Sequence, residues 1–384
     1  MPVKKKILIL ANSSSGLYDF RNELVTALLS QYNVAVSLPD TQKTDLLEKE
    51  GCRVIHTPIN RRGTNPTQDL ALFNHYRQLL KREKPDLVLT YTIKPNIYGG
   101  LACQKEHVPY LSTITGLGSA FERSGLFLEF IKELYRKGLA GASCVFFQNR
   151  ENMELFHASS LVTGKDRLVS GSGVSLKTWE PLPYPQGDNT VFLYVGRVMK
   201  EKGIGEYLQA AEALHGEKVT FLIVGYCEED WQEILDARKK EGVIVQFDYQ
   251  NDMHAFYEKC SAVVLPTYHE GMSNVLMEAA ACARPVIASS ISGCREIFED
   301  GVTGYGFVPK SADALIEALK KFLALPQSAR AAMGLSGREK MEREFDRSLV
   351  VASYLEEIHQ ALGDEEAKQF LCRRYGAAGS RKRA

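Results

Sequence analysis

The stretch that decides the fold reads AVVLPTYHEGMSNVLMEAAACARPVIA, from Ala262 to Ala288. Its first four and last three residues are short apolar runs of the kind that form buried strands. Ser273 or Asn274 can cap a helix that we expect over Val275–Ala283, and the Arg-Pro pair that follows ends it. A strand, a helix and a strand in this order predict one βαβ unit of a parallel sheet.

The same alternation of short apolar runs and longer amphipathic segments extends over most of the chain. It predicts an α/β protein with two Rossmann-like, doubly wound parallel-sheet domains that face each other across a cleft. In such sheets ligands bind beyond the carboxyl ends of the strands. The expected strands are Ile7–Leu10, Val34–Leu38, Leu87–Tyr91, Tyr110–Ile114 and Val145–Phe147, then Val191–Val195, Val219–Val224, Val243–Phe247, Ala262–Leu265 and Val286–Ala288.

The length of 384 residues exceeds one comfortable core and favours two domains. Three prolines in five residues interrupt the alternation and predict an interdomain linker over 181–189. The linker separates a first domain over 1–180 from a second over 190–345, which a C-terminal helix over 346–363 follows. Residues 364–384 are basic and poor in apolar side chains, so we expect a mobile tail.

Composition excludes several classes of protein. Lysine plus arginine and aspartate plus glutamate both total 47, whereas a dedicated nucleic-acid-binding protein normally has a basic excess. The eight cysteines are scattered singly, which favours a reducing compartment over disulfides or a zinc site. The apolar run near the N-terminus is too short for a signal peptide, and no run approaches the roughly 20 apolar residues of a membrane span. We therefore expect a cytoplasmic protein.

Two carboxylates frame the helix of the opening stretch. Glu270 precedes the helix and Glu278 lies about one turn inside it. On one continuous helix, residues eight apart would be separated by roughly 80° and 12 Å, a poor shared face. With Glu270 in the loop, the two can instead hold opposite ends of a ligand whose diphosphate rests on the helix N-terminus, beside the backbone of Gly271 and residues 272–274. Two acids that merely complement the helix dipole remain the alternative.

A second cluster follows the first strand of the second domain. There Arg197 and Lys202 stand five residues apart between Gly196 and Gly203. Two cations at the carboxyl end of a strand can neutralise a diphosphate. Solvated loop charges are the alternative, which is usual for lysine.

Loops of the first domain give weaker signals. The turn that contains Gly16 follows a strand and suits an anion, although a serine N-cap in a tight loop explains it equally well. Lys94 and Asn96 lie in YTIKPNIYGG, and Thr115 and Gly116 lie in TITGLG, each after a strand. Glycines there allow close approach of a ligand but also serve ordinary sharp turns. Neither a G-x-G-x-x-G fingerprint nor a Walker A motif is present.

Together, the E-x7-E of the second domain, its G-R-x4-K-G and the proline-rich linker resemble the retaining glycosyltransferases of the GT-B fold, family 4. The resemblance extends over nearly the whole chain, to about Leu362. Within the family, YTIKPNIYGG, TITGLGSAF and SGCREIFEDGVTGYGFVP are most similar to bacterial enzymes of surface-glycan assembly. Those enzymes transfer N-acetylgalactosamine or a related sugar from UDP to an undecaprenyl-diphosphate-linked saccharide.

The resemblance implies roles for individual residues. Arg197 and Lys202 would bind the diphosphate, Glu270 would hold the donor sugar, and these three are the expected catalytic residues. Glu278 would take the ribose hydroxyls. Further donor contacts are expected at Gly16, Gly196, Gly271, Met272, Ser273, Asn274 and Val275, and acceptor or cleft contacts at Lys94, Asn96, Thr115 and Gly116.

One departure from the family concerns the end of a first-domain strand. Many members have a histidine there that contacts the donor sugar, whereas this chain has Thr115-Gly116. No first-domain catalytic base is therefore assigned. The resemblance implies retention of anomeric configuration, and the lack of a D-x-D motif fits a site without metal or other cofactor.

A lipid-linked acceptor would require contact with a membrane. The segment Ser124–Lys137 is rich in leucine and phenylalanine and basic at its end, so it can lie in the interface of an anionic membrane. Ordinary packing of a helix on a sheet is the alternative. The basic tail would either add attraction to anionic lipids or only aid solubility.

Three rival functions stay open. A UDP-sugar 2-epimerase shares the two-domain architecture and the UDP-sugar. A nicotinamide dehydrogenase would need the glycine fingerprint that this chain lacks. A two-domain binding protein without catalysis would normally carry a secretion signal.

Overall fold

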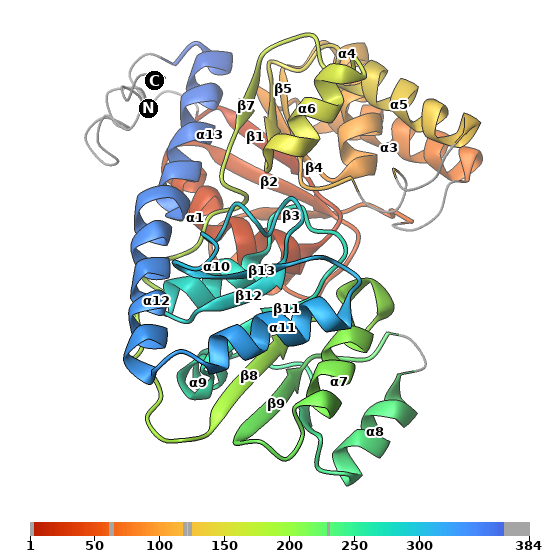
Figure 1. The fold of residues 1–384 in the computed structure, drawn as a ribbon. Coiled ribbons are helices and arrows are strands. Elements are labelled where there is room, and N and C mark those ends of the chain that lie inside the picture. Colours follow the sequence, from red (N-terminus) through yellow and green to blue (C-terminus); the bar gives the residue numbers. More distant parts are fainter. Residues whose placement is uncertain (1–3, 61–64, 118–120, 122–124, 229–230, 365–384) are drawn as a thin grey trace. The chain divides into compact units, whose positions relative to one another are not determined.

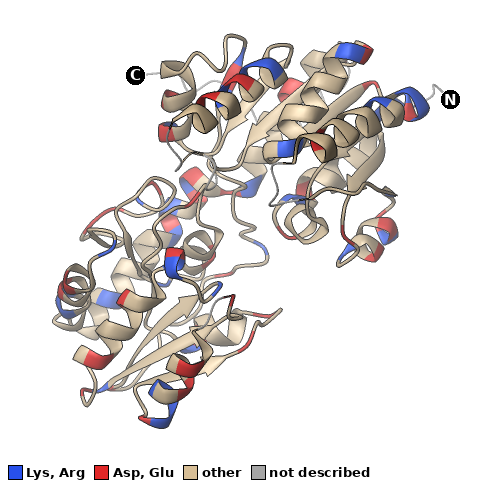
Figure 2. Ribbon diagram, turned by 90° about the vertical axis from the view of Figure 1, so that its right-hand side faces the viewer, with Lys and Arg blue, Asp and Glu red and all other residues tan. Residues whose placement is uncertain are grey.

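The computed structural model describes residues 4–60, 65–117, 121, 125–228 and 231–364. The chain divides into two compact units (Figure 1). The first consists of residues up to Ser172 together with the chain from Arg347 onward, and the second is Gly173–Asp346. Acidic and basic residues are interspersed in both units (Figure 2).

The first unit is built on a parallel sheet of seven strands in the order β3-β2-β1-β4-β5-β6-β7. Strand β1 lies inside the sheet and is apolar after Lys6, and its Leu8 pairs with Ala35 on one side and Val88 on the other. The strands are β1 (Lys6–Leu10), β2 (Asn33–Leu38), β3 (Arg53–His56), β4 (Leu87–Tyr91), β5 (Tyr110–Ile114), β6 (Cys144–Phe147) and β7 (Asp166–Leu168). The helices are α1 (Ser14–Gln31), α2 (Thr44–Lys49), α3 (Pro66–Glu83), the π-helix η1 (Pro95–Gly99), α4 (Gly100–Glu106), α5 (Leu126–Leu139), α6 (Arg150–Ala158) and α13 (Arg347–Leu362).

Helix α13 comes from the far end of the sequence and completes the first unit beside α1 (Figure 1). The ring of Tyr354 stacks on Phe146 of β6 with 4.0 Å between centroids. Its hydroxyl is 2.7 Å from Thr113 Oγ1, and Arg347 pairs with Glu23 of α1 at 2.7 Å. The predicted C-terminal helix is therefore an integral part of the first unit.

The second unit is built on a parallel sheet of six strands in the order β10-β9-β8-β11-β12-β13. Its strands are β8 (Thr190–Val195), β9 (Val219–Val224), β10 (Ile244–Phe247), β11 (Ala262–Leu265), β12 (Val286–Ser289) and β13 (Gly304–Phe307). Its helices are the 3₁₀-helix η2 (Lys200–Lys202), α7 (Ile204–Ala213), α8 (Gln232–Lys240), α9 (His254–Lys259), α10 (Asn274–Ala281), α11 (Ala312–Leu323), α12 (Gln327–Lys340) and the π-helix η3 (Met341–Phe345).

The proline-rich segment 181–189 lies within the second unit, because the chain changes unit earlier, after Ser172. The fully buried side chain of Arg284 holds this segment. It donates hydrogen bonds to the carbonyl oxygens of Leu182 at 3.1 Å and Pro183 at 2.7 Å. The expected basic tail lies outside the described residues, apart from Asp364.

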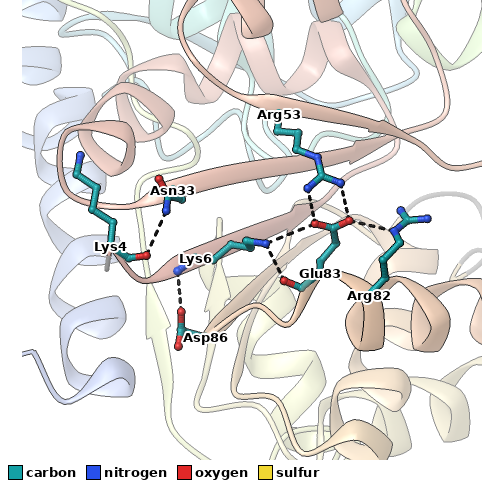
Figure 3. A network of polar contacts seen from close by, with 7 residues as sticks. All are labelled: Lys4, Lys6, Asn33, Arg53, Arg82, Glu83 and Asp86. Carbon is teal, nitrogen blue, oxygen red and sulfur yellow. Dashed lines mark hydrogen bonds and ion pairs between the residues drawn. The ribbon is translucent and has the colours of Figure 1, made fainter. Parts of the chain in front are cut away.

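A network of polar contacts lies at the amino ends of the first unit's strands (Figure 3). Glu83, at the end of α3, is almost fully buried and accepts two hydrogen bonds from Arg53 at 2.6 and 2.8 Å. Arg82 Nε donates to it at 3.1 Å, and Lys6 Nζ lies 3.6 Å from it. The Lys6 backbone N–H also donates to Asp86 at 2.7 Å. Because ligands of such sheets bind at the carboxyl ends, we regard this network as structural.

Candidate functional site

The second unit brings three loops together around the carboxyl end of β8. In the sheet order, β8 lies between β9 and β11, and the direction of winding reverses there. Loops at such a reversal leave room for a ligand beyond the strands. The loop after β8 carries Arg197 and Lys202, and the loop after β11 carries Glu270.

Lys202 and Glu270 form a partly buried ion pair across two of these loops. Lys202 Nζ lies 2.6 Å from Glu270 Oε1, and neither side chain is more than 19% exposed. The loops are also joined through their backbones, because the Tyr268 N–H donates to the Glu201 carbonyl at 2.9 Å. The structure therefore places together two residues that are 68 positions apart in the sequence and that the sequence assigns to one ligand.

Arg197 extends to the opposite neighbour, the loop after β9. Its Nη1 lies 2.7 Å from Glu228 Oε2, and the Tyr226 hydroxyl donates to Glu228 Oε1 at 3.3 Å. The backbone of Val198 pairs with this loop, since its N–H donates to the Tyr226 carbonyl at 2.9 Å. Gly196 precedes Arg197, and its N–H donates to the Val224 carbonyl. Glu228 was not expected from the sequence, because only the sheet topology brings it to Arg197.

Helix α10 spans Asn274–Ala281, so it begins one residue before and ends two residues before the expected bounds, and of the two candidates Ser273 is the N-cap. The Ser273 Oγ accepts a hydrogen bond from the Leu276 N–H at 3.4 Å. Met272 and Ser273 are buried, and Val275 packs against the core, so these residues would meet a ligand mainly through backbone groups. Gly271 is only partly buried.

Glu278 lies in the second turn of α10, eight residues after Glu270. The hydroxyl of Tyr257, on α9, donates to Glu278 Oε2 at 3.2 Å. Burial and the Glu278 charge raise the pKa of Tyr257, so this phenol stays protonated and acts as a donor. Tyr257 is thus a supporting residue for Glu278 that the sequence did not suggest.

The loop after β12, which contains Gly293, packs against the backbone of Glu270. Gly293 has a φ of +84°, and a Cβ there would lie 2.8 Å from the carbonyl oxygens of Glu270 and Gly271. Its own carbonyl accepts from the Ser273 N–H at 2.8 Å, and its N–H donates to Glu296 at 2.7 Å. The SGCRE segment, which the sequence tied to the family only as a motif, thus has a physical role in positioning the loop.

In the first unit, the structure gives Lys94 and Asn96 different surroundings. Lys94 Nζ pairs with Asp69 of α3 at 2.7 Å, and both side chains are 14% exposed. Asn96 is only 1% exposed, and its amide bonds the Thr113 carbonyl at 2.8 Å and the Thr90 hydroxyl at 2.7 Å. Asn96 therefore joins β4 to β5, and in this structure it offers no free amide to an acceptor.

The loop around Gly16 has the N-cap arrangement that was one of its two interpretations. The Gly16 N–H donates to Ser13 Oγ at 3.2 Å. The adjacent Ser14 N–H lies 3.2 Å from both carboxylate oxygens of Asp40, and its hydroxyl also bonds that carboxylate. The N-terminus of α1 therefore already has an anion of the chain itself as its partner.

Thr115 and Gly116 directly follow β5, with Gly116 at a φ of +144°. The Gln148 amide, oriented to satisfy both of its neighbours, donates to the Thr115 carbonyl at 3.2 Å and accepts from Arg21 at 2.9 Å. The Arg21 guanidinium lies over the Tyr91 ring at 4.3 Å. The end of β5, where the chain departs from the family pattern, is thus linked through Gln148 to the buried cation Arg21.

Two kinds of feature are absent from the described ranges. No three His, Cys, Asp or Glu side chains gather there in the manner of a metal site. None of the helices within those ranges is long and apolar enough to cross a membrane.

Comparison with known families gives one match in each unit. Residues 183–340 match the model described as glycosyl transferases group 1, and residues 6–149 match the one described as glycosyl transferase 4-like. A relative from Campylobacter jejuni is N,N'-diacetylbacillosaminyl-diphospho-undecaprenol alpha-1,3-N-acetylgalactosaminyltransferase, 24% identical over 91% of this chain and 97% of its own. The capsular polysaccharide biosynthesis glycosyltransferase CapM of Staphylococcus aureus is 25% identical over 90% and 94%.

Solved structures show the same fold at low identity. Sucrose-phosphate synthase from Thermosynechococcus elongatus superposes with a TM-score of 0.75 at 20% identity, over 94% of this chain and all of the other. Anabaena HepE in complex with UDP-glucose gives 0.76 at 19%, over 92% and 99%. With a group 1 match in one Rossmann-like unit and a family 4-like match in the other, the chain belongs to the glycosyltransferases of the GT-B fold.

Proposed function

We propose that the protein is a retaining, UDP-sugar-dependent glycosyltransferase that acts on a polyprenyl-diphosphate-linked saccharide. It would transfer a hexose or an N-acetylhexosamine, with N-acetylgalactosamine as the first candidate, in the assembly of a bacterial surface glycan or a glycoprotein glycan. The name of the Campylobacter relative supports the acceptor and the sugar, and CapM supports surface-glycan assembly. The HepE complex with UDP-glucose supports the donor.

The observation that carries the proposal is the ion pair of Lys202 with Glu270 at the reversal point of the second sheet. A cation and an acid held there suit a ligand with a diphosphate and a sugar joined to it. The diphosphate would attract Lys202 and Arg197 away from their present partners, Glu270 and Glu228. Glu270, released from the lysine, would then accept hydrogen bonds from hydroxyls of the donor sugar.

Electrostatic stabilisation of the leaving group would supply most of the catalysis. As the bond from the anomeric carbon to the phosphate oxygen breaks, negative charge grows on UDP. Arg197, Lys202 and the positive N-terminal end of α10 would stabilise this charge. Glu278 would hold the ribose hydroxyls and so fix the position of the nucleotide.

The acceptor hydroxyl would attack from the side on which UDP leaves, so that the configuration at the anomeric carbon is retained. Its proton would pass to the departing phosphate oxygen. No first-unit side chain is given the role of a base. The scheme needs no metal, and we expect full transfer activity after treatment with EDTA.

A panel of UDP-sugars offered with a lipid-linked saccharide tests the proposal. We expect one sugar to be transferred with release of UDP, and NMR of the product to show the anomeric configuration of the donor. Conversion of a UDP-sugar to an isomer without an acceptor would instead identify an epimerase. A chain that binds UDP-sugars and leaves them unchanged would be a binding protein, and an inverted product would contradict retention.

A further inference from the structure

A buried cation near the carboxyl ends of the first sheet has no acidic partner within the described residues. Arg21, in α1, is only 7% exposed. Its guanidinium lies 4.3 Å from the centroid of the Tyr91 ring and donates hydrogen bonds to the hydroxyl of Tyr354 and, at 2.9 Å, to the amide oxygen of Gln148. All three partners are neutral. Because a buried charge without a counter-charge normally destabilises a fold, the retention of Arg21 points to a use for its charge.

Other buried arginines of the chain hold parts of the fold together. Arg347 is also 7% exposed and lies against α1, but it pairs with Glu23 at 2.7 Å. Arg284 donates to backbone carbonyl oxygens of the proline-rich segment. Arg21 instead bonds Gln148, which directly follows β6 at the edge of the sheet where ligands of such folds bind.

Gln148 connects this charge to one peptide group. Its amide is buried, at 6% exposure, and the amide nitrogen donates to the Thr115 carbonyl at 3.2 Å. The Thr115–Gly116 peptide is trans, so the Gly116 N–H points away from that carbonyl and from the buried amide. Gly116 is only partly buried, and no acceptor for its N–H lies within the described part of the chain. The peptide thus offers a free donor just beyond the end of β5.

The charge of Arg21 makes this donor stronger. A hydrogen bond from a charged group is stronger than one between neutral groups, and hydrogen bonds in a chain polarise one another. The guanidinium therefore polarises the Gln148 amide, and that amide polarises the Thr115–Gly116 peptide. A donor of this kind, fixed before a substrate arrives, stabilises an oxygen atom without rearrangement of the protein.

We propose that the Gly116 N–H donates to an oxygen atom of a sugar substrate, and that Arg21 and Gln148 are positioning residues for this contact. The inference rests on the proposed function, which supplies two sugar substrates, the lipid-linked saccharide and the UDP-sugar. Both carry hydroxyl and ring oxygens that accept hydrogen bonds. Arg21 and Gln148 act only through the peptide and touch neither substrate.

Gln148→Glu separates positioning from a purely structural role. The carboxylate would give Arg21 an ion pair, so the variant should resist urea at least as well as the unmodified chain. It has no N–H for the Thr115 carbonyl, so the KM for one of the sugar substrates should rise by about tenfold, roughly the loss of one hydrogen bond. A rise for the lipid-linked saccharide would assign the oxygen atom to the acceptor, and a rise for the UDP-sugar would assign it to the donor. Retained stability with both KM values unchanged would overturn the proposal.

NMR on the full chain tests the polarised peptide without any substrate. Threonine labelled with ¹³C at its carbonyl, together with ¹⁵N-labelled glycine, gives signals from three Thr-Gly pairs, which end at Gly116, Gly164 and Gly304. Thr115→Ser assigns the first of them. Because a hydrogen bond to a carbonyl deshields the nitrogen of the same peptide, the Gly116 nitrogen should move upfield in Gln148→Glu while the other two signals stay. An unmoved Gly116 signal would overturn the proposal.

Arg21→Met removes the charge and keeps most of the length of the side chain. It should move the Gly116 nitrogen in the same direction, and Arg21→Lys, which keeps the charge, should move it less. Arg347→Met is the matched control. It removes the pair with Glu23 of the same helix, so it should lower the stability in urea and leave the Gly116 signal in place. An equal shift in this control would show a general response to the packing of α1 and overturn the proposal.

The inference and the proposed function can fail separately. If the Gly116 nitrogen shifts in Gln148→Glu and Arg21→Met but no sugar is transferred to a lipid-linked saccharide, the polarised peptide stands and the proposed function falls. If transfer occurs and Gln148→Glu changes neither KM, the proposed function stands and the inference falls.

Discussion

At the scale of single residues, the proposed function depends on Arg197 and Lys202, which are paired with Glu228 and Glu270 in this structure. Arg197→Ala and Lys202→Ala should each lower kcat by about 100-fold or more, since charge on the departing diphosphate would lose a partner. Initial rates with a UDP-sugar and a lipid-linked acceptor measure this, and circular dichroism should show an unchanged fold. Lys200→Ala, two positions before Lys202, is the control and should keep its activity. Unmodified rates in Arg197→Ala or Lys202→Ala would contradict the proposed role of that residue in binding the diphosphate.

Glu278 belongs to nucleotide binding in the proposed scheme and not to the chemical step. Glu278→Ala should weaken UDP binding by about tenfold or more, because two ribose hydroxyls would lose a charged acceptor. Calorimetry with UDP measures this directly. Tyr257→Phe, which removes only the hydroxyl that supports Glu278 at 3.2 Å, should have a smaller effect of the same sign. An unchanged affinity in Glu278→Ala would exclude the ribose role.

At the scale of elements, the entry to α7 depends on a residue without a side chain. Gly203 has a φ of +70°, and a Cβ would lie 2.0 Å from the Pro266 carbonyl oxygen. Gly203→Ala should therefore lower the free energy of unfolding by more than the roughly 1–3 kcal/mol of backbone strain alone. Gly216→Ala is a matched control, because Gly216 also has a positive φ, of +89°, but nothing within 4 Å of the added carbon. Urea denaturation compares them, and equal losses would mean that the contact with Pro266 has no weight.

The sequence predicted the inner strands of both sheets well and the edge strands poorly. All ten expected strands are confirmed. Nine of them lie inside a sheet, where continuous apolar runs are the signal of a strand buried on both faces, and β10 is the exception at an edge. Three strands near the edges were missed: β3, β7 and β13. Charged residues begin β3 and β7, and two glycines interrupt β13, so none of the three has a continuous apolar run.

The candidate site could be predicted only as far as its motifs extend. Arg197, Lys202, Glu270 and Glu278 follow strand ends that the apolar runs reveal. Their partners could not be derived, because Glu228 meets Arg197 through the pairing of β8 with β9, and hydrophobic patterns do not give strand order. For the same reason, no pattern in the sequence connects Gly293 with the backbone of Glu270.

At the scale of the whole molecule, acid stability should depend on the network around Glu83 (Figure 3). Burial alone would raise the pKa of Glu83, but hydrogen bonds from Arg82 and Arg53 and the charges of Arg53 and Lys6 outweigh it and hold the pKa below its ordinary value of 4.5. Because the pKa of Glu83 is lower in the folded chain than in the unfolded chain, the carboxylate stabilises the fold fully at a pH above the unfolded-state pKa. This stabilisation is lost as the pH falls through the folded-state pKa.

Glu83→Gln should therefore destabilise the protein at neutral pH by about 1–3 kcal/mol, since the buried side chain loses its charge-assisted hydrogen bonds from Arg53 and Arg82. The difference from the unmodified chain should shrink as the pH is lowered below 4.5. Urea denaturation between neutral and acidic pH measures it. The exposed acid Asp188 pairs with Lys218 on the surface of the second unit, and Asp188→Asn serves as the control with little effect expected. A difference that stays constant with pH would contradict the account.

The return of α13 to the first unit has a consequence for synthesis on the ribosome. Residues 173–346 are continuous in sequence, so the second unit can fold as soon as they have emerged. The first unit, although translated earlier, must keep the surface around Phe146 uncovered until Tyr354 arrives some two hundred residues later. Domains commonly fold in the order in which they are made. In this chain the part that is made first is completed last, and during that interval it is the part most exposed to aggregation and to chaperones.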